Sequence, residues 1–398
     1  MGEFRNKILN FAEYYLQPRI HGYIRREKAK RYERIGEKTL GKSAPRALLI
    51  YVTSAIPYYI SGNVMACPFI DSHAMIWEAA EMVRLLNHSG YVVDVLDCFE
   101  KKHNIDWETY NVIIDERNNL IHAPQIQGQT KVYYSTGMQW EFHNAAEMLR
   151  TRFFHARHGI WLNPQRIVEP IMSDCVASHM TYFGNPENLN PFAAKPEKHP
   201  LNVSVTHVPE KIFFTKRPLD FLWMGSSGAL HKGLDLAVDA LADIKGSKLH
   251  IFGHLNADPL YRFWLKDMCN KHPNVVYHGP AKINSESFRQ IASSCLAHVY
   301  PSCAEGGPGS VAQTGHFGLI PIVTQTANVR SAVHGIVLKG ENDHSLISSI
   351  RQSAETLLSL GDNELKARRE AIIDFSRANH TREAYSQSIK QVFNHILK

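Results

Sequence analysis

The sequence predicts an α/β protein of two domains, each a parallel sheet covered by helices. Two sets of short apolar segments alternate with segments of helical periodicity, and a stretch rich in Pro and Asn, residues 184–200, lies between the sets. The length of 398 residues also exceeds that of one ordinary domain. We therefore expect two Rossmann-like domains, residues 46–205 and 206–375, facing each other across a cleft suited to small molecules.

The first set begins with residues 46–53, a short apolar run that predicts a strand. Residues 72–86 carry apolar side chains at helical spacing and end before Asn-His-Ser-Gly, a helix stop, so they predict a helix. The other elements predicted in this set are strands at 91–97, 110–116 and 172–180, and a strand, turn and helix over 130–150.

The second set repeats this alternation. Strands are predicted at 219–227, 248–254, 274–280, 296–302 and 320–324, and helices at 231–244, 260–272, 287–295 and 309–318. A C-terminal helix is expected within residues 376–398, packed back on the first domain. Because strand and helix alternate, the sheet should be parallel, and ligands should bind beyond the carboxyl ends of its strands.

The formal charge of +6 is concentrated at the N-terminus, because residues 1–46 hold 12 Lys and Arg against 5 Asp and Glu. A helical stripe there can be formed by Ile20, Tyr23, Ile24 and Ile35, so we interpret residues 1–45 as a basic helical extension packed on the first domain. The alternative is a segment attracted to anionic phospholipid or to a polyanionic acceptor. Nucleic acid is not expected as a partner, because no nucleic-acid motif accompanies the charges.

Targeting and metal-binding patterns are not found in the sequence. The N-terminus lacks the apolar core of a signal peptide, and no apolar run approaches the ~20 residues that span a bilayer. The six cysteines are scattered without ligand-like spacing, and His155 and His158 have no accompanying acidic ligands. We expect a cytoplasmic protein without a metal site, located at the inner face of the membrane if the basic extension binds phospholipid.

Residues 301–323 place an acid, a proline and a glycine cluster directly before an apolar segment. Glu305 is followed by Gly306, Gly307 and Gly309. These residues come after a predicted strand, where the sheet delivers the chain to a ligand, and the helix that follows offers its free N–H groups and dipole to a phosphate. The glycines permit a close approach. A tight strand-to-helix turn would explain the same glycines.

Lys232 lies after another predicted strand, close to the position of a diphosphate bound at the first helix. The segment from Gly225 to Lys232 is a poor P-loop, because Gly233 follows the lysine in place of Ser or Thr. A solvated lysine is the alternative interpretation. The combination of Lys232 with the Glu305 loop favours an anion-binding role.

Four motifs give the second half a family resemblance. In order they are FLWMGSSGALHKGLDLAVDAL, IFG, VVYHGP and YPSCAEGGPGSVAQTGHFGLIPIV. Residues 220–340 thereby resemble the nucleotide-sugar domain of glycosyltransferase family 4, which has the GT-B fold. The first half is similar to bacterial surface-polysaccharide members of this family in residues 46–53, 72–97 and 133–153. The resemblance covers about residues 46–375 and is stronger in the second half.

This resemblance implies roles for individual residues. It assigns Lys232 to the donor diphosphate and Glu305 to hydroxyls of the transferred sugar, and these two residues would carry catalysis. The donor-binding set that it implies is Gly225, Ser226, Ser227, Lys232, Gly253, His278, Gly279, Glu305, Gly306, Gly307, Gly309, Ser310, Val311 and Gln313.

The sequence departs from the family pattern at three points. Ser226 replaces the basic residue that commonly follows the strand glycine, and Gln313 replaces the second acid of the usual pair. A histidine that is often found just after a strand of the first domain is absent, and Gln139 occupies that loop. The acceptor-side candidates are His73, Gln139, Trp140 and His143, although Trp140 also suits a core position and His73 an ordinary helix cap.

The resemblance implies a retaining, metal-independent hexosyltransferase that moves a sugar from a nucleotide-diphosphate sugar to a glycan or a lipid-linked acceptor in surface-polysaccharide biosynthesis. No cofactor is expected besides this donor substrate. In such a transfer the departing diphosphate is thought to take the acceptor proton, so the protein positions the reactants and stabilises charge. The alternatives are a GT-B sugar-nucleotide epimerase and a catalytically silent nucleotide-sugar-binding subunit, which the changes at Ser226 and Gln313 would permit.

Overall fold

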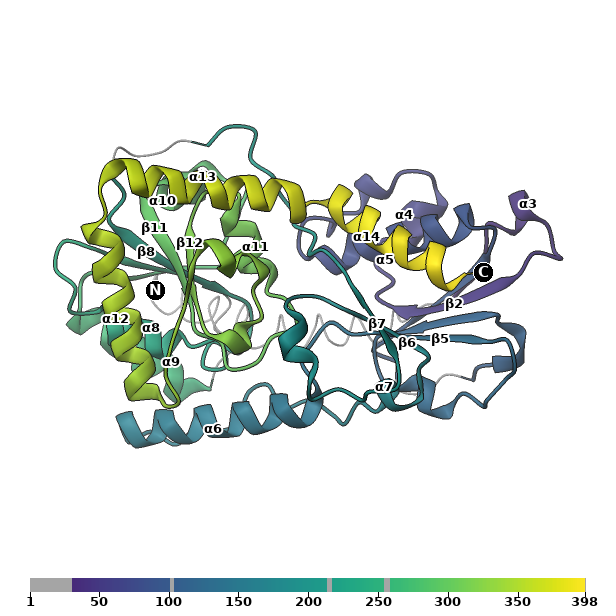
Figure 1. Cartoon of the computed structure of the whole chain (residues 1–398), viewed down its shortest axis with the longest axis horizontal. Coiled ribbons are helices and arrows are strands. Elements are labelled where there is room, and N and C mark those ends of the chain that lie inside the picture. The colour runs from purple at the N-terminus through teal and green to yellow at the C-terminus, as the bar shows by residue number, and fades with distance from the viewer. Residues whose placement is uncertain (1–30, 101–103, 213–216, 254–257, 398) are drawn as a thin grey trace, which may run out of the picture.

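The computed structural model describes residues 31–100, 104–212, 217–253 and 258–397. They form two α/β domains that lie end to end, each built on one sheet (Figure 1). The predicted fold class of two Rossmann-like domains is confirmed. Most of the basic extension, residues 1–30, lies outside the described residues.

The sheet of the first domain has seven strands in the order β1-β3-β2-β4-β5-β6-β7, and neighbours are parallel except for β1 and β3. Its inner strands are almost wholly buried, which explains their continuous apolar sequences. The strands are β1 (Tyr32–Ile35), β2 (Arg46–Tyr51), β3 (Val92–Asp97), β4 (Val112–Asp115), β5 (Thr130–Tyr134), β6 (His179–Tyr182) and β7 (Glu197–Pro200).

The sheet of the second domain has six parallel strands in the order β10-β9-β8-β11-β12-β13. The strands are β8 (Asp220–Gly225), β9 (Leu249–Gly253), β10 (Val275–Gly279), β11 (Cys295–Tyr300), β12 (Ile320–Val323) and β13 (Ile336–Val337). Because β8 and β11 are parallel neighbours, the loops that follow them meet at one edge of the sheet.

Helices cover both sheets (Figure 1). Those within the first half of the chain are α3 (Glu37–Leu40), α4 (Ile56–Ile60), α5 (Ala74–His88), α6 (Trp140–His158) and α7 (Ser173–Val176). Those within the second half are α8 (Leu234–Leu241), α9 (Pro259–Lys271), α10 (Glu286–Ser294), α11 (Gly309–Gly315), α12 (Asp343–Ser359), α13 (Asp362–Asn379) and α14 (Arg382–Ile396). Within the described residues, no helix combines the length and the apolar composition that crossing a membrane requires.

Two helices pack on the domain that does not contain their sequence neighbours (Figure 1). Helix α6 follows β5 of the first sheet, yet Phe154 is fully buried in the core of the second domain, where its ring lies 5.2 Å from that of Trp264. Helix α14 returns to the first domain, where the Tyr385 hydroxyl lies 2.9 Å from that of Tyr134. Each of these helices therefore ties the two domains together.

Three predicted elements differ from the structure. Residues 172–180 were expected to form a strand, but the first half is helix α7 and the strand starts at His179. The predicted loop 184–200 ends in β7, an edge strand that accommodates Pro200 because its outer side is not paired within this sheet. The helical stripe predicted for the basic extension includes Ile35, but Ile35 lies in β1, where it is buried and pairs with β3.

Candidate functional site

Lys232 and Glu305 lie close together beyond the carboxyl ends of β8 and β11, two neighbouring inner strands of the second sheet. The order of strands predicts this. Lys232 lies in the turn between β8 and α8, and Glu305 lies in the loop between β11 and α11. The Lys232 Nζ atom is 2.6 Å from Glu305 Oε1, and the two side chains are only 6% and 11% exposed. The Tyr300 hydroxyl and the Ser302 hydroxyl also donate to Oε1, at 3.0 and 3.2 Å. None of these bonds involves Oε2.

Arg166 is the second cation at this carboxylate, and sequence reasoning missed it. It comes from the first half of the chain, in the irregular segment after α6, and its Nη1 atom is 3.4 Å from Glu305 Oε1. A Cβ atom on Gly228 would lie 2.1 Å from Arg166 Cδ, and Gly228 also has a φ of +81°. Gly228 therefore gives Arg166 the space to cross the loop that carries Ser226.

Two side chains of α6 hold the backbone of Arg166. The Arg166 N–H donates to Glu147 Oε1 at 3.2 Å, and the Arg166 carbonyl oxygen accepts a hydrogen bond from His143 Nε2 at 2.7 Å. Burial lowers the pKa of His143 to about 4, so its ring is neutral. These two hydrogen bonds fix the backbone from which the Arg166 side chain extends toward Glu305.

Burial and the neighbouring charges shift the pKa values of Glu305 and Lys232 in opposite directions. Burial by itself would raise the pKa of Glu305, but Lys232 and Arg166 outweigh it and hold that pKa well below its usual range. Burial lowers the pKa of Lys232 to about 8 although the Glu305 carboxylate acts in the other direction, so the amine is still protonated at pH 7. Two cations thus share one carboxylate at the edge of the sheet.

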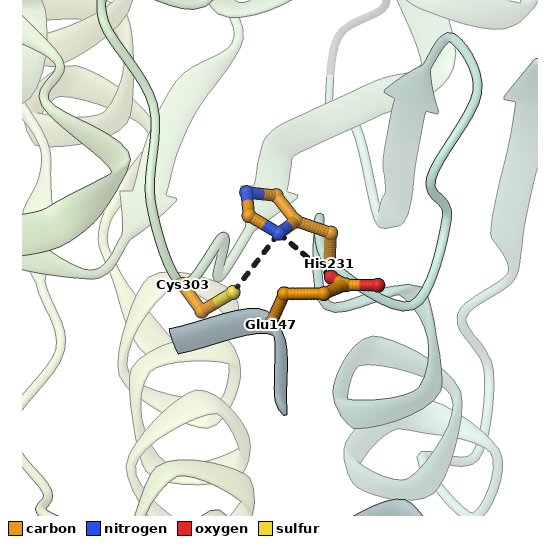
Figure 2. A group of neighbouring side chains, drawn as sticks. All are labelled: Glu147, His231 and Cys303. Atoms are coloured by element: carbon orange, nitrogen blue, oxygen red, sulfur yellow. Dashed lines mark hydrogen bonds and ion pairs between the residues drawn. The ribbon is translucent and has the colours of Figure 1, made fainter. Parts of the chain in front are cut away.

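A buried ion pair joins His231, the residue before Lys232, to Glu147 of α6 (Figure 2). His231 and Glu147 are both fully buried, and His231 Nδ1 is 2.8 Å from Glu147 Oε2. His231 Nε2 is 2.6 Å from the Ala304 carbonyl oxygen, so both ring nitrogens face acceptors and both carry protons. Burial would lower the pKa of His231, but its hydrogen-bond partners Cys303 and Glu147 raise it to about 9. The imidazolium ring joins α6 to both loops of the site.

The Cys303 Sγ atom lies 3.3 Å from His231 Nδ1, the nitrogen that also faces Glu147. Cys303, His231 and Glu147 form a group whose geometry could hold a metal ion (Figure 2). Its surroundings disfavour a metal. Arg150, Arg166 and Lys232 all act electrostatically on this group. These three cations would repel a divalent metal ion, so we assign Glu147 and His231 as an ion pair.

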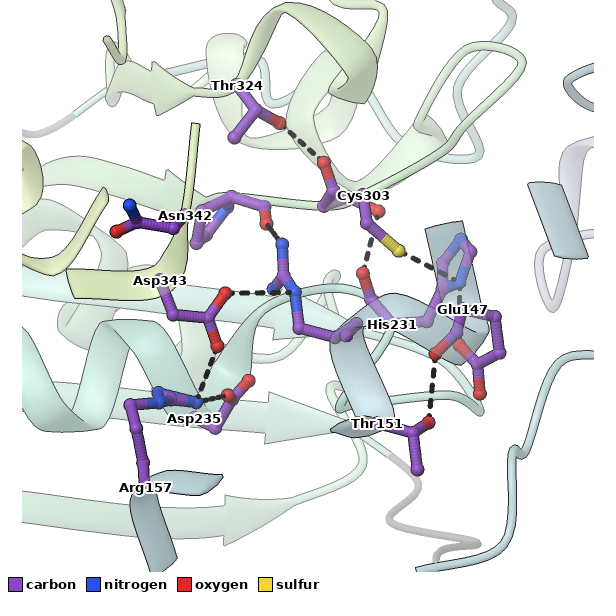
Figure 3. A network of polar contacts seen from close by, with 12 residues as sticks. Glu147, Thr151, Arg157, His231, Asp235, Cys303, Thr324, Asn342 and Asp343 are labelled. Carbon is purple, nitrogen blue, oxygen red and sulfur yellow. Dashed lines mark hydrogen bonds and ion pairs between the residues drawn. The ribbon is translucent and has the colours of Figure 1, made fainter. Parts of the chain in front are cut away.

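Further ion pairs fix α6 to the second domain (Figure 3). Arg157, at the end of α6, contacts the carboxylates of Asp235 on α8 and Asp343 on α12. Arg150 donates to the Pro301 carbonyl oxygen at 3.1 Å, at the start of the Glu305 loop. These ion pairs and the His231–Glu147 pair all hold α6 against the loops of the second domain. A shift of α6 would therefore change the shape of the site.

The glycines of the Glu305 loop approach the first domain. A Cβ atom on Gly306 would lie 2.3 Å from the Thr136 carbonyl oxygen, and one on Gly307 would lie 2.6 Å from Phe183 Cβ. Gly309, the first residue of α11, has open space around it. The glycine cluster predicts a close approach of other atoms, and at Gly306 and Gly307 those atoms belong to the first domain. Of the three glycines, only Gly309 faces free space, at the N-terminus of α11.

The remaining predicted donor residues lie at strand ends of the same sheet, with different surroundings. Ser226 and Ser227 are exposed in the turn after β8, and Val311 is buried in α11 beside Ser310. Gly225 and Gly253, the last residues of β8 and β9, face each other, since a Cβ atom on Gly253 would lie 2.2 Å from the Gly225 carbonyl oxygen.

His278 and Gly279 end β10, two strands away from β8. The exposed His278 ring stacks on Phe252 with ring centroids 4.7 Å apart. The structure therefore does not bring them beside Glu305.

Gln313 is buried in α11 and holds the segment that connects the domains. Its Oε1 atom accepts from the His207 N–H at 3.2 Å, and its Nε2 atom donates to the His207 carbonyl oxygen. A carboxylate at position 313 would face this carbonyl oxygen without a proton to donate, which explains why an amide suits the position.

The acceptor-side candidates do not form one cluster. His73 is an exposed N-cap of α5 that accepts the Met75 N–H, and Gln139 is the N-cap of α6 that accepts the Phe142 N–H. Trp140 begins α6, and its indole nitrogen is buried. His143 is the candidate that reaches the site, where its ring stacks on His231 at 4.5 Å.

The fold and part of the sequence match known proteins. Residues 218–356 match the family model described as glycosyl transferases group 1. Sucrose-phosphate synthase from Thermosynechococcus elongatus is 11% identical, with 88% of this chain and 99% of that chain covered and a TM-score of 0.55. No curated protein matches the chain.

Two other solved structures are similar. Anabaena Alr3699/HepE in complex with UDP and glucose is 13% identical, with 88% of this chain and 100% of that chain covered and a TM-score of 0.53. WaaG, a glycosyltransferase involved in lipopolysaccharide biosynthesis, is 12% identical, with 87% and 98% covered and a TM-score of 0.51. The chain thus has the GT-B fold, and its residues 218–356 match glycosyl transferases group 1.

Proposed function

We propose that the protein is a retaining, metal-independent hexosyltransferase that moves a sugar from a nucleotide-diphosphate sugar to a glycan or lipid-linked acceptor. The observation that carries the proposal is the convergence of Lys232 and Arg166 on Glu305, beyond the carboxyl ends of β8 and β11. This edge of the sheet belongs to the segment that matches glycosyl transferases group 1. The nucleotide sugar is a substrate, and the proposal includes no further cofactor.

In this proposal Lys232 and Arg166 bind the two phosphates of the donor. The Arg166 guanidinium group crosses the loop of Ser226 and supplies the charge that this serine lacks. Glu305 uses Oε1 for the cations, so Oε2 remains to accept hydroxyl groups of the transferred sugar. A planar guanidinium group and a point-charge ammonium group are both suited to phosphate oxygens.

The transfer step needs no nucleophile from the protein. The bond between the sugar C1 atom and the diphosphate oxygen breaks, and the acceptor oxygen bonds to C1 on the same face. The acceptor proton passes to the departing phosphate oxygen, so charge and atoms balance. Lys232 and Arg166 stabilise the negative charge that develops on the leaving diphosphate.

For the acceptor we propose a surface glycan or its lipid-linked precursor, with contact to anionic phospholipid through residues 1–45. The likeness to WaaG, which acts in lipopolysaccharide biosynthesis, is in keeping with this acceptor. The resemblance of residues 46–53, 72–97 and 133–153 to surface-polysaccharide enzymes supports it as well.

A silent nucleotide-sugar-binding subunit is the second candidate, because Gln313 is engaged with His207 and is not free to hold a ribose. A transferase and a silent binding subunit differ in whether they release a nucleoside diphosphate. A panel of nucleotide sugars screened by thermal shift finds the donor in either case, since ligand at 100 times its Kd stabilises by about 2.7 kcal/mol. Release of the nucleoside diphosphate on incubation with this donor and an acceptor glycan identifies the transferase, and a binder releases none.

The two proposed phosphate contacts predict the effect of Lys232→Met and Arg166→Met. The probe is UDP, the nucleotide bound in the similar Alr3699/HepE structure. Each variant should weaken its binding, measured by calorimetry, by about 1.5–2 kcal/mol, or roughly 10- to 30-fold, because a charge-assisted hydrogen bond is lost. Methionine keeps the apolar volume of each side chain. The control is Lys131→Met, which removes a buried lysine of the first domain that donates to the Ala123 and Pro124 carbonyl oxygens.

Lys131→Met should leave the affinity for UDP unchanged. If Arg166→Met behaves like this control while Lys232→Met weakens UDP, the diphosphate is held by Lys232 without Arg166. If neither variant of the site affects UDP, the assignment of this edge to the donor diphosphate is wrong.

A further inference from the structure

A second group of histidines lies at the edge of the first sheet, away from the donor site. Strands β6 and β7 are parallel neighbours, and the register pairs His179 with Glu197 and Thr181 with His199. Because alternate residues of a strand share a face, His179, Glu197 and His199 lie on one side of the sheet. Glu197 and His199 are two residues apart, but His179 lies on the preceding strand, so the strand pairing is needed to bring the three together.

The distances between the polar atoms of this group suit one small ion. His179 Nδ1 is 3.1 Å from His199 Nε2 and 3.6 Å from Glu197 Oε2. One ligand atom from each of the three residues lies within 4.8 Å of the other two. A zinc ion with bonds of about 2.0–2.1 Å in tetrahedral geometry holds its ligand atoms about 3.3 Å apart. Small side-chain adjustments would bring the three atoms onto one ion.

A fourth residue supports the carboxylate of this group. His395, in the last turn of α14, places its Nε2 atom 2.9 Å from Glu197 Oε1, the oxygen that does not face His179. Its ring centroid is 5.4 Å from that of His199. Carboxylates that bind metals are themselves hydrogen-bonded in this way, which fixes their orientation.

The charge state of the group also suits a cation. His179 Nδ1 lies 3.6 Å from the Glu197 carboxylate, and an unprotonated imidazole nitrogen beside an anion offers its lone pair to a metal ion. The neighbouring Lys198 points its ammonium group at the Ala193 carbonyl oxygen, at 2.9 Å. This differs from the His231 group, where three cations surround the polar atoms.

We propose that His179, His199 and Glu197 form a binding site for a divalent transition-metal ion, Zn²⁺ above all, with His395 orienting the carboxylate. Two imidazoles and a carboxylate are ligands that zinc accepts, and water would complete the coordination. A bound ion would tie the edge strand β7 to the end of α14, the helix that crosses from the second domain. The proposal is independent of the transferase function.

The test is titration of the metal-free full-length protein with ZnCl₂ by calorimetry, and with CoCl₂ by absorption spectroscopy. The expected result is one Zn²⁺ per chain and the visible bands of four-coordinate Co²⁺. His179→Ala and the exposed Glu197→Gln should each weaken Zn²⁺ about 100-fold or more, and His395→Ala about 10-fold, as expected for an outer-shell partner. Glu197→Gln alters an exposed side chain, so it tests the site even if His179→Ala does not fold.

Two controls distinguish this site from others. His272→Ala removes a histidine whose Nδ1 atom lies 3.6 Å from the Asp243 carboxylate, and it should leave Zn²⁺ binding unchanged. Cys303→Ser tests the buried Glu147 group and should also have no effect. The proposal is overturned if the metal-free protein binds no Zn²⁺, if Glu197→Gln binds it as tightly as the unaltered protein, or if either control variant removes the binding.

Discussion

Raising the pH from about 6.5 to about 9 is expected to remove about 3 kcal/mol of stability that protonated His231 contributes through its partners Cys303 and Glu147. The folded pKa of His231, about 9, lies above its ordinary value of 6.5, so the folded protein holds this proton more tightly than the unfolded chain. The contribution is complete below pH 6.5 and is lost as the pH rises through 9. Urea unfolding at a series of pH values measures it.

Variants separate this contribution from those of other groups. Glu147→Gln leaves a buried imidazole without its anion and should cost about 3–5 kcal/mol at pH 7. It should also make the decline between pH 6.5 and 9 smaller, because Glu147 is one of the partners that raise the pKa of His231, after Cys303. The matched control is His298→Gln, because burial lowers the pKa of His298 to about 3 and its proton loss lies below this window. If Glu147→Gln keeps the wild-type slope, His231 is not the titrating group.

Much of the fold could be predicted because it depends on local patterns. Alternating apolar strands and amphipathic helices predict two parallel sheets, and the inner strands are buried as expected. The edges of the first sheet were missed, because β7 reads Glu-Lys-His-Pro and has the composition of a loop. Pairing with β6 decides that conformation, and no local pattern reports it.

The position of α6 could not be predicted for a different reason. Helical spacing and the polar residues of α6 predict a helix, but they do not say which sheet it covers. Its contacts with the second domain include Phe154 and the buried charges Glu147 and Arg157. The partners of these two charges lie about 80 residues further along the chain or, for Asp343, further still. Charged residues in a helix are usually solvated, so their burial here is visible only in the folded structure.

The part of the candidate site that lies at strand ends could be predicted from the sequence. Lys232 and Glu305 follow neighbouring parallel strands, so the order of strands brings them together. Arg166 gave no signal, because it lies in an irregular segment 139 residues before its carboxylate partner. His231 stands beside Lys232 in the quoted motif, but its charge depends on Glu147, which only the position of α6 supplies.

Glu305→Gln is expected to reduce sugar transfer about 100-fold while leaving the affinity for UDP unchanged or higher. In the proposed site the carboxylate accepts hydroxyl groups of the donor sugar, and losing charged hydrogen bonds of this kind costs about 3 kcal/mol. The same carboxylate lies against Lys232 and Arg166, the cations proposed to bind the diphosphate. Neutralising it removes a like charge from beside the phosphates, so UDP alone should not bind more weakly.

The measurement that separates the two roles is the transfer rate together with the Kd of UDP, for the same variant. The matched control is Glu78→Gln, a buried carboxyl of the first domain that contacts Ser204 and Tyr51, and it should change neither quantity more than about twofold. A Glu305→Gln variant that binds UDP more weakly yet transfers sugar normally would mean that Glu305 serves the nucleotide. In that case Oε1 would hold the two cations apart for the phosphates, the sugar hydroxyl groups would have another partner, and the silent binder would become the better proposal.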